Sequence, residues 1–322
     1  MQEMRETEGT AGRIETLHGS ELPNENASMT AVVEHQPVYS HILFHPMHNS
    51  YAEPYVFVMF PSEPELSFQF NDGQYESAAQ LHSRAQQICA VLYPGDGTQE
   101  GKLLRLKQQF FLCSASLQDI IFRFKERKPD RVSGKWSEFP SKVAVQMNDT
   151  HPTLVIPELM RILMDEEGLG WDEAWDVTNK AVAYTNHTVL PEAFEKWSQA
   201  VMRKLLPRQM EIIEEIDKRF RELVISTRKD IEGKLDSMSV LDNSPQKPVV
   251  RMANLCVVAA HTVNGVAELH SNILKEELFA DYLSIWICDA SGHTCSLTCI
   301  ITDTIWDLLR DVEVADVYML CQ

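Results

Sequence analysis

The chain has 322 residues, of which 44% are hydrophobic and 24% charged, a balance typical of a soluble globular protein. Its formal net charge of −18 argues against nucleic acid or an anionic membrane as a partner, because phosphate groups repel an acidic surface. A neutral sugar or polyol is compatible with this charge. No apolar run approaches the roughly 18 to 20 residues that a membrane-spanning helix needs, so we expect no such helix.

The seven cysteines are scattered without a CxxC pair, which suits a reducing compartment better than a disulfide framework. Cys288, Cys295 and Cys299 lie close together around His293, but their spacing fits no standard zinc motif, and we predict no metal site there. Residues 1–10 are polar and resemble neither a signal peptide nor a transit peptide. These features predict a cytoplasmic protein.

Helix and strand signals fill the chain from residue 68 to residue 286. Apolar residues at helical spacing predict helices over 78–92, 103–127, 156–165, 171–184, 207–222 and 266–279, with one more opening at Pro191. The apolar run over 142–147 predicts a buried strand, and 248–260 is apolar enough for a strand or another buried segment. This alternation predicts an α/β layer architecture.

Three segments differ in composition, and they predict the domain organisation. Residues 1–67 are polar and then rich in proline, so we expect them to be largely irregular. Residues 68–286 form the predicted folded part. Residues 287–322 are rich in cysteine and threonine and then acidic, and we expect an irregular extension without a core of its own.

Polar turns that hold a histidine follow three of the apolar segments. They cover 148–152 (NDTHP), 185–188 (TNHT) and 261–265 (HTVNG), and a helix is predicted after each. In open α/β sheets, ligands bind in the crevice beyond the carboxyl ends of the strands. The three turns are therefore the best candidates for a functional site.

Two other interpretations of these turns remain open. Asp, Asn and Thr are the residues that cap helix N-termini, so the turns could serve only as caps. Alternatively, His151, His187 and His261 could bind one zinc ion, although the sequence gives no reason for the three to converge.

Four long stretches of the chain are distinctive: FNDGQYESAAQLHSRAQQICAVLYPGD, AVQMNDTHPTLVIPELMRILMD, WDEAWDVTNKAVAYTNHTVLPEAFEKW and MANLCVVAAHTVNGVAELHSNILK. They resemble the α-1,4-glucan phosphorylase family, the glycogen and starch phosphorylases, and in particular its plant cytosolic form. The resemblance runs from about Phe68 to Trp286. It implies that the chain is part of the N-terminal, Rossmann-like domain of a two-domain glycosyltransferase.

The resemblance also implies roles for individual residues. Asp149 and His151 would belong to the wall of the catalytic cleft, and His187 would contact the sugar near its O6.

Four more residues would contact or border the glucose unit in the same family scheme. They are Thr188, Glu195, Val266 and, in the YPGDG turn at the mouth of the site, Asp96.

Members of this family transfer a glucosyl unit from the end of an α-1,4-glucan to inorganic phosphate, which yields glucose 1-phosphate. They use pyridoxal 5'-phosphate, held as a Schiff base on a lysine, and they form dimers. The resemblance therefore implies α-1,4-glucan and phosphate as partners, a homodimer or heterodimer, and pyridoxal phosphate as the family cofactor.

The family's cofactor-lysine motif, EASGTGNMK, does not occur in this chain, and the resemblance stops at both ends. We therefore expect no cofactor-binding residue here, and a chain that is inactive alone, because catalytic groups from both walls of a cleft must act together. The alternative is a non-catalytic fragment that binds glucan or forms a heterodimer.

Overall fold

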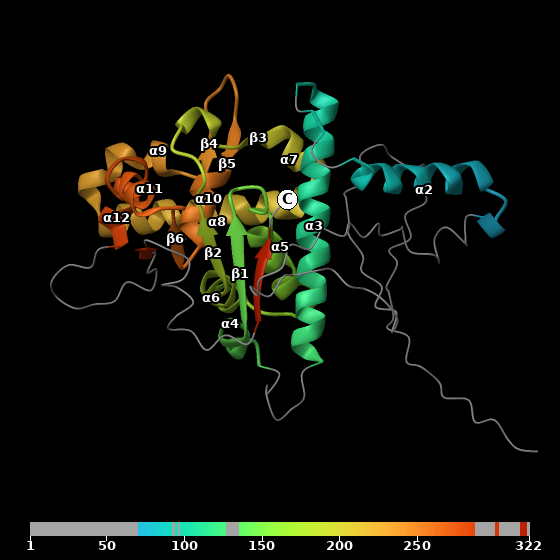
Figure 1. The fold of residues 1–322 in the computed structure, drawn as a ribbon, viewed down its shortest axis with the longest axis horizontal. Helices are drawn as coiled ribbons and strands as arrows, with labels where there is room; N and C mark the ends of the chain where they lie inside the picture. Colours follow the sequence, from blue (N-terminus) through green and yellow to red (C-terminus); the bar gives the residue numbers. More distant parts are fainter. Residues whose placement is uncertain are drawn as a thin grey trace, which may run out of the picture.

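The computed structural model describes residues 70–91, 94–95, 97–126, 135–286, 300–302 and 316–320. Its centre is a sheet of five parallel strands in the order β7-β6-β2-β1-β8 (Figure 1). The strands are β1 (Val143–Asn148), β2 (Val182–Thr185), β6 (Thr262–Asn264), β7 (Ile300–Thr302) and β8 (Asp316–Leu320). The α/β prediction is confirmed.

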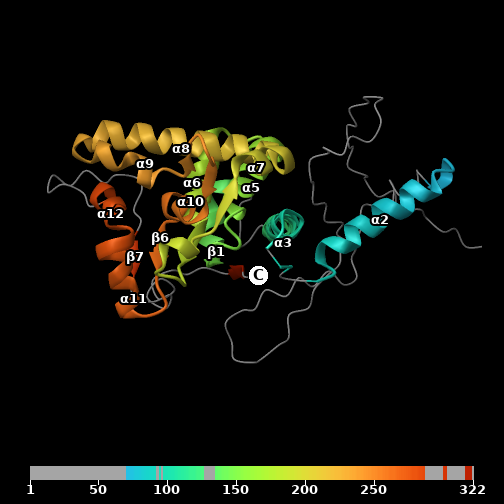
Figure 2. The same cartoon turned by 90° about the horizontal axis from the view of Figure 1, so that it is seen from above.

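The strands β1 and β2 are buried almost completely, as expected for a parallel sheet covered by helices. Four longer helices pack with the sheet: α3 (Gln99–Lys125), α5 (Val155–Arg161), α6 (Trp171–Ala181) and α8 (Pro207–Thr227). In Figure 2, α8 lies along one side of the molecule and α3 is seen end-on near β1. Their apolar faces form one continuous core with the sheet.

Helix α3 begins where the sequence supplies an N-cap, because Thr98 Oγ1 accepts a hydrogen bond from the Gly101 N–H at 3.0 Å. The preceding helix α2 (Tyr75–Cys89) projects away from the sheet in both ribbon views (Figures 1 and 2). The amide of Gln108 in α3 donates to the Ile88 and Val91 carbonyls at 2.7 Å, and so ties the end of α2 to α3.

The remaining described elements are short. The helical ones are η1 (Trp136–Glu138), α4 (Phe139–Lys142), η2 (Ile162–Glu166), η3 (Pro191–Ala193), α7 (Gln199–Leu205), η4 (Lys229–Lys234), α9 (Leu235–Met238), α10 (Met252–Ala259), α11 (Glu268–Ile273), η5 (Leu274–Leu278) and α12 (Ala280–Trp286). A second, antiparallel sheet has the order β3-β5-β4, with β3 (Lys196–Ser198), β4 (Leu241–Asp242) and β5 (Val249–Arg251).

Several predicted elements differ from those observed. The segment 171–184 changes from helix to strand at Val182, because β2 must enter the sheet there. Pro191 opens only the short turn η3, which ends before β3. The apolar segment 248–260 is mainly the buried helix α10, since all-round burial removes the amphipathic pattern by which a helix is recognised.

The expectation of an irregular C-terminal extension is wrong for two stretches of it. β7 pairs with β6 and β8 pairs with β1, so the segment 287–322 adds one parallel strand to each edge of the sheet. Apolar strand signals in IIT and DVYML are short, and periodicity alone does not separate them from loops. The prediction for residues 1–67 lies outside the described residues.

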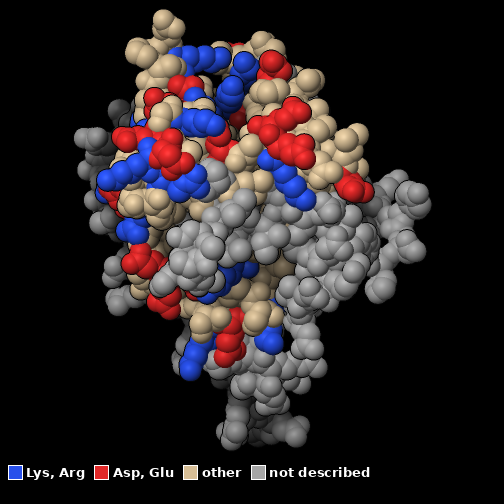
Figure 3. Space-filling view, turned by 90° about the vertical axis from the view of Figure 1, so that its left-hand side faces the viewer, with Lys and Arg blue, Asp and Glu red and all other residues tan. Residues whose placement is uncertain are grey.

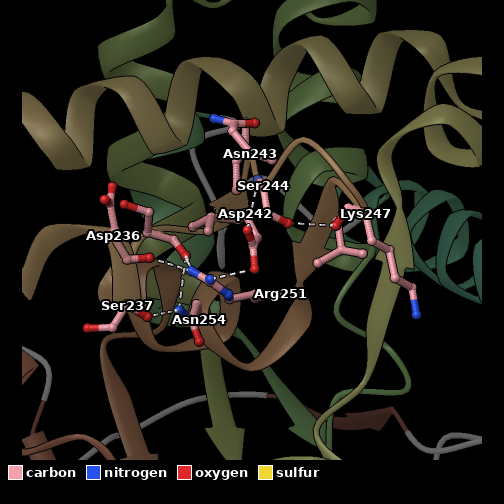
Figure 4. A network of polar contacts seen from close by, with 12 residues as sticks. Asp236, Ser237, Asp242, Asn243, Ser244, Lys247, Arg251 and Asn254 are labelled. Atoms are coloured by element: carbon pink, nitrogen blue, oxygen red, sulfur yellow. Dashed lines mark hydrogen bonds and ion pairs between the residues drawn. The ribbon is translucent and has the colours of Figure 1, made fainter.

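A polar network around Arg251 joins the second sheet to α9 (Figure 4). The guanidinium of Arg251 donates to the carbonyls of Asp236 and Ser239 and pairs with the Asp242 carboxylate at 2.7 Å. Asn254 Nδ2 donates to the Ser237 carbonyl at 3.0 Å. The last carbonyls of a helix have no partner inside the helix, so these side chains serve as the C-terminal cap of α9.

Acidic and basic side chains are interleaved over the side of the molecule that carries α9, α11 and α12 (Figure 3). Exposed ion pairs include Arg219 with Asp172 at 2.7 Å and Lys234 with Asp281 at 2.6 Å. Such pairs contribute little stability, about 0 to 1 kcal/mol each. The interleaved signs in Figure 3 give the described part of this side a mixed rather than a single-sign charge.

Within the described ranges, no helix combines the length and the hydropathy needed to cross a bilayer.

Candidate functional site at the carboxyl ends of the parallel strands

The strands β1, β2 and β6 end side by side. Asn148 is in register with Thr185, and Thr185 is in register with Asn264. The ladder continues one step beyond the strands, since the Asp149 N–H donates to the Thr185 carbonyl at 2.9 Å and the Asn186 N–H to the Asn264 carbonyl at 2.8 Å. The turns that follow the three strands therefore begin next to one another.

Asp149 begins the turn after β1 in an unusual backbone conformation. Its φ of 64° lies in the left-handed region, which Asp and Asn tolerate better than most residues. The Asp149 carboxylate accepts a hydrogen bond from the Thr150 N–H at 2.7 Å, which holds the side chain along its own turn. His151 is the next residue but one and is partly exposed.

His187 joins the turn after β2 to the end of β1. Its Nε2 is hydrogen-bonded to Asn148 Oδ1 at 2.5 Å. Because an amide oxygen only accepts, Nε2 carries the hydrogen, and in the neutral ring Nδ1 can then accept a hydrogen bond. The imidazole of His187 is exposed, so a ligand can reach it.

Glu195 lies between α3 and the turn after β1. Its Oε1 accepts from Gln109 Nε2 at 2.9 Å and pairs with Arg105 Nε at 3.4 Å, and its Oε2 accepts from Thr150 Oγ1 at 3.3 Å. Both carboxylate oxygens therefore have partners within the protein, and the side chain is 16% exposed. In this structure Glu195 fixes the turn against α3.

Thr188 and Val266 follow β2 and β6, the neighbouring strands. The Thr188 N–H donates to Asn186 Oδ1 at 3.0 Å, and the Val266 N–H donates to His270 Nδ1 at 3.2 Å. Val266 is 57% exposed. Other exposed apolar side chains lie close to Thr188 and Val266 in the sequence: Val189, Leu190 and Leu269.

A buried polar layer lies beneath these turns. Asn186 is completely buried and donates from Nδ2 to the Tyr184 hydroxyl at 2.8 Å. Burial, together with the nearby Cys256, Asp149 and Glu195, raises the pKa of Tyr184 well above its usual value, so the phenol stays protonated. This layer provides a rigid base for the exposed side chains.

The interpretation of the polar turns as helix caps is wrong. Helix α5 begins after Leu154, η3 after Leu190 and α11 after Ala267, and none of the three N-termini has a side-chain cap. Some of their polar side chains bond one another across the strand ends, as His187 does with Asn148. Others accept from their own turn, as Thr188 Oγ1 does from the Leu190 N–H at 3.3 Å.

The zinc interpretation is wrong as well. His261 precedes β6, and its N–H donates to the carbonyl of Val182 at the start of β2, whereas His151 and His187 follow the ends of β1 and β2. All strands of this parallel sheet run in one direction, so His261 lies at the amino ends of the strands, opposite to the candidate site. Nowhere in the described part do three His, Cys, Asp or Glu side chains form a metal-binding group.

The site residues predicted from the sequence thus separate into two groups. Asp149, His151, His187, Thr188 and Val266 lie on adjoining turns after β1, β2 and β6, and Glu195 borders them. Asp96 lies outside the described residues.

Sequence reasoning missed four residues that support these turns: Asn148, Asn186, Tyr184 and His270. Asn148 and Asn186 lie at the ends of predicted apolar segments, and this position is a sequence signal that could have identified them. His270 lies in a helix, and no sequence signal separates it from a surface histidine.

The residues of this site do not fit pyridoxal phosphate. The turns 148–154, 185–195 and 264–267 contain neither lysine nor arginine, so they offer no amine for the cofactor's aldehyde and no cation for its phosphate. They offer imidazole, carboxylate, hydroxyl and amide groups beside apolar side chains. This set can hydrogen-bond the hydroxyl groups of a neutral sugar.

Comparisons with known proteins identify the family. The family model for carbohydrate phosphorylase matches residues 51–302. The chain is 90% identical over 231 residues to an alpha-glucan phosphorylase, H isozyme, of Triticum aestivum, and 79% identical over 231 residues to the cytosolic alpha-glucan phosphorylase 2 of Arabidopsis thaliana. Each match covers 72% of this chain and 28% of the relative.

A chloroplastic/amyloplastic L-1 isozyme of Solanum tuberosum is 46% identical over 294 residues, a match that covers 67% of this chain and 30% of that protein. The chain therefore spans less than a third of the length of these relatives. Because the family model matches more than half of the sequence, the chain belongs to the carbohydrate phosphorylase family.

Proposed function

We propose that this chain carries the glucose-binding wall of an α-glucan phosphorylase active site and binds the end of an α-1,4-glucan. The observation that supports this is the adjoining position of the turns after β1, β2 and β6, which hold the NDTHP, TNHT and NGV sequences. Ligands of open α/β sheets bind beyond the carboxyl ends of the strands. A neutral glucan also suits a chain with a net charge of −18.

Each residue has a proposed role in this site. Asp149 and His151 form part of the wall beside the glucosyl unit. His187 uses the free Nδ1 of its imidazole to accept a hydrogen bond from a sugar hydroxyl, most simply that on O6.

Four further residues complete the proposed contacts. The Thr188 hydroxyl donates to or accepts from the sugar, and Val266 packs on an apolar face of the ring. Glu195 holds the Thr150 turn in place, and Asp96 borders the entrance.

In the whole protein this wall would take part in the phosphorolysis of α-1,4-glucan to glucose 1-phosphate. We propose that the chain is a piece of the N-terminal, Rossmann-like domain of a two-domain glycosyltransferase fold. Pyridoxal phosphate would supply the proton transfer to and from the attacking phosphate. Since the three turns hold no lysine or arginine, that chemistry needs residues beyond this site. Because the family's cofactor-lysine motif does not occur in the sequence, we propose that the chain alone is inactive.

We also propose a cytoplasmic location, in line with the cytosolic relative of Arabidopsis thaliana. A homodimeric or heterodimeric state is a second proposal, which rests on the family resemblance. Size-exclusion chromatography with light scattering, alone and beside a full-length plant phosphorylase, tests the second point. A strictly monomeric chain that never co-elutes with the full-length protein contradicts it.

The function is tested by two assays on the purified chain. Calorimetry with maltoheptaose should detect binding that a His187→Ala substitution weakens. Release of glucose 1-phosphate from soluble starch, with phosphate and pyridoxal phosphate added, should stay at the level of that variant, while a full-length phosphorylase is active. Phosphate-dependent release by the chain would refute its inactivity, and the absence of binding would refute the glucan site.

A further inference from the structure

His270 connects two of the turns that end at this site. It lies in α11, and its Nδ1 accepts a hydrogen bond from the Val266 N–H at 3.2 Å, in the turn after β6. Its Nε2 contacts Asn186 Oδ1 at 3.0 Å, in the turn after β2. One imidazole therefore bridges the turns after β2 and β6, although Asn186 lies 84 residues before His270 in the chain.

The two contacts determine the protonation state of the ring. A backbone N–H only donates, so Nδ1 of His270 must carry a lone pair. An amide oxygen only accepts, so Nε2 must carry the hydrogen. Both hydrogen bonds form together only in the neutral Nε2–H tautomer.

The surrounding atoms keep this arrangement tight. A Cβ atom added at Gly265 would lie 3.0 Å from Cγ of His270 and 2.9 Å from the Ser271 nitrogen. The Gly265 N–H also donates to Ser271 Oγ at 3.1 Å. The turn after β6 is therefore packed directly against α11, and glycine allows this approach.

Asn186 transmits the contact to Thr188. Its Oδ1 accepts from both His270 and the Thr188 N–H, and its Nδ2 donates to the Tyr184 hydroxyl. The chain of bonds thus runs from Val266 through His270 and Asn186 to Thr188.

We propose that His270 is a positioning residue, which in its neutral Nε2–H form sets the spacing between Val266 and Thr188. The positioning stands on geometry alone. Its consequence for glucan binding rests on the proposed function.

The tautomer is the first test. Long-range 1H–15N correlation spectra of the 15N-labelled chain distinguish the two neutral forms of each histidine. We expect the Nε2–H form for His270 near neutral pH. An Nδ1–H form, or rapid exchange between the two forms, would overturn the proposal without the need for any variant.

Two substitutions separate the two hydrogen bonds. The side chain of His270→Gln can reach Asn186 with an amide donor but offers no acceptor at the Nδ1 position. We expect hydrogen exchange of the Val266 amide to become roughly 2- to 10-fold faster, the range that the loss of one hydrogen bond gives. His270→Asn places an acceptor near the Nδ1 position, so it should keep the Val266 amide protected while the Asn186 side-chain resonances shift.

Glu268→Gln is the matched control, because Glu268 is exposed on the same helix. It should leave both the hydrogen exchange of the Val266 amide and the Asn186 side-chain resonances unchanged. Equal exchange of the Val266 amide in the wild type and His270→Gln would contradict the positioning role.

Maltoheptaose binding then tests the consequence. We expect both His270 variants, but not the control, to weaken it roughly 2- to 10-fold, since each loses one hydrogen bond of the bridge. Wild-type affinity in both variants would contradict the effect on the sugar. If the wild type itself binds no maltoheptaose, the proposed function fails, while the tautomer and exchange results still decide the positioning role.

Discussion

The fully buried carboxylate of Glu158 is paired with Arg161, one helical turn later in α5. Arg161 Nε donates to Oε2 at 2.9 Å and Nη2 to Oε1 at 2.8 Å. Ser114 of α3 and Gln209 of α8 complete the shell at 2.7 Å each. This carboxylate therefore holds together three helices that cover the sheet.

Loss of the Glu158 carboxylate should destabilise the fold strongly. Glu158→Ala leaves Arg161, Ser114 and Gln209 without their shared acceptor, and breaking such a buried pair costs about 3 to 5 kcal/mol. Urea unfolding followed by circular dichroism measures the change. Glu211→Gln is the control, because Glu211 forms an exposed ion pair with Arg208 and should cost about 0 to 1 kcal/mol. Equal effects of the two substitutions would show that the buried pair has no special role.

The stability of Asp149 variants should depend on how well the new residue tolerates a positive φ. Its φ of 64° is tolerated by Asn, and Asp149→Asn also keeps an acceptor for the Thr150 N–H. A β-branched residue is strained in this region, so Asp149→Val should cost about 1 to 3 kcal/mol. Thermal unfolding of both variants tests this, and a Val variant as stable as the Asn variant would contradict the strained turn.

Burial lowers the pKa of His261 from 6.5 to about 4. In the unfolded chain the group takes up a proton near its ordinary pKa, whereas in the folded chain it stays neutral. The unfolded state therefore binds more protons between pH 6.5 and 4, and stability should fall as the pH decreases through this window, by at most about 3 kcal/mol.

His261→Gln removes this titration, so the stability of the variant should depend less on pH between 6.5 and 4 than that of the wild type. Urea unfolding at several pH values gives both curves. Parallel curves would mean that His261 titrates normally in the folded chain.

The buried thiols should be unreactive in the folded chain. Burial raises the pKa of Cys113 and of Cys256 far above the ordinary value, and that of Cys89 to about 11. Because the thiolate is the reactive form, iodoacetamide at pH 8 should label the peptides with Cys113 and Cys256 only after denaturation. Mass spectrometry of tryptic peptides measures this, and rapid labelling of either cysteine under native conditions would contradict its burial.

Much of the helical layer could be predicted from the sequence, because α3 and α8 are amphipathic and their periodicity is clear. α10 could not, since a helix buried on all sides lacks that pattern. β7 and β8 were missed because their pairing with β6 and β1 depends on distant segments, which local patterns do not report.

Only part of the candidate site could be predicted from the sequence. The turns with Asp149 and His187 follow recognisable apolar segments, and their strands pair in the structure. His261 follows an apolar segment too, but that segment is a helix, so the histidine precedes its strand instead of following it. The bridge made by His270 depends on the contact of α11 with the turn after β2, and no spacing in the sequence reveals this contact.

The proposed glucan site is tested most directly by mapping where maltoheptaose binds, with amide chemical-shift changes of the labelled chain. The account predicts changes at Asp149–Thr150, His187–Thr188 and Gly265–Val266, with His261 and the starts of the strands unaffected. Chemical-shift changes at the amino ends of the strands, or no saturable change at all, would contradict the account.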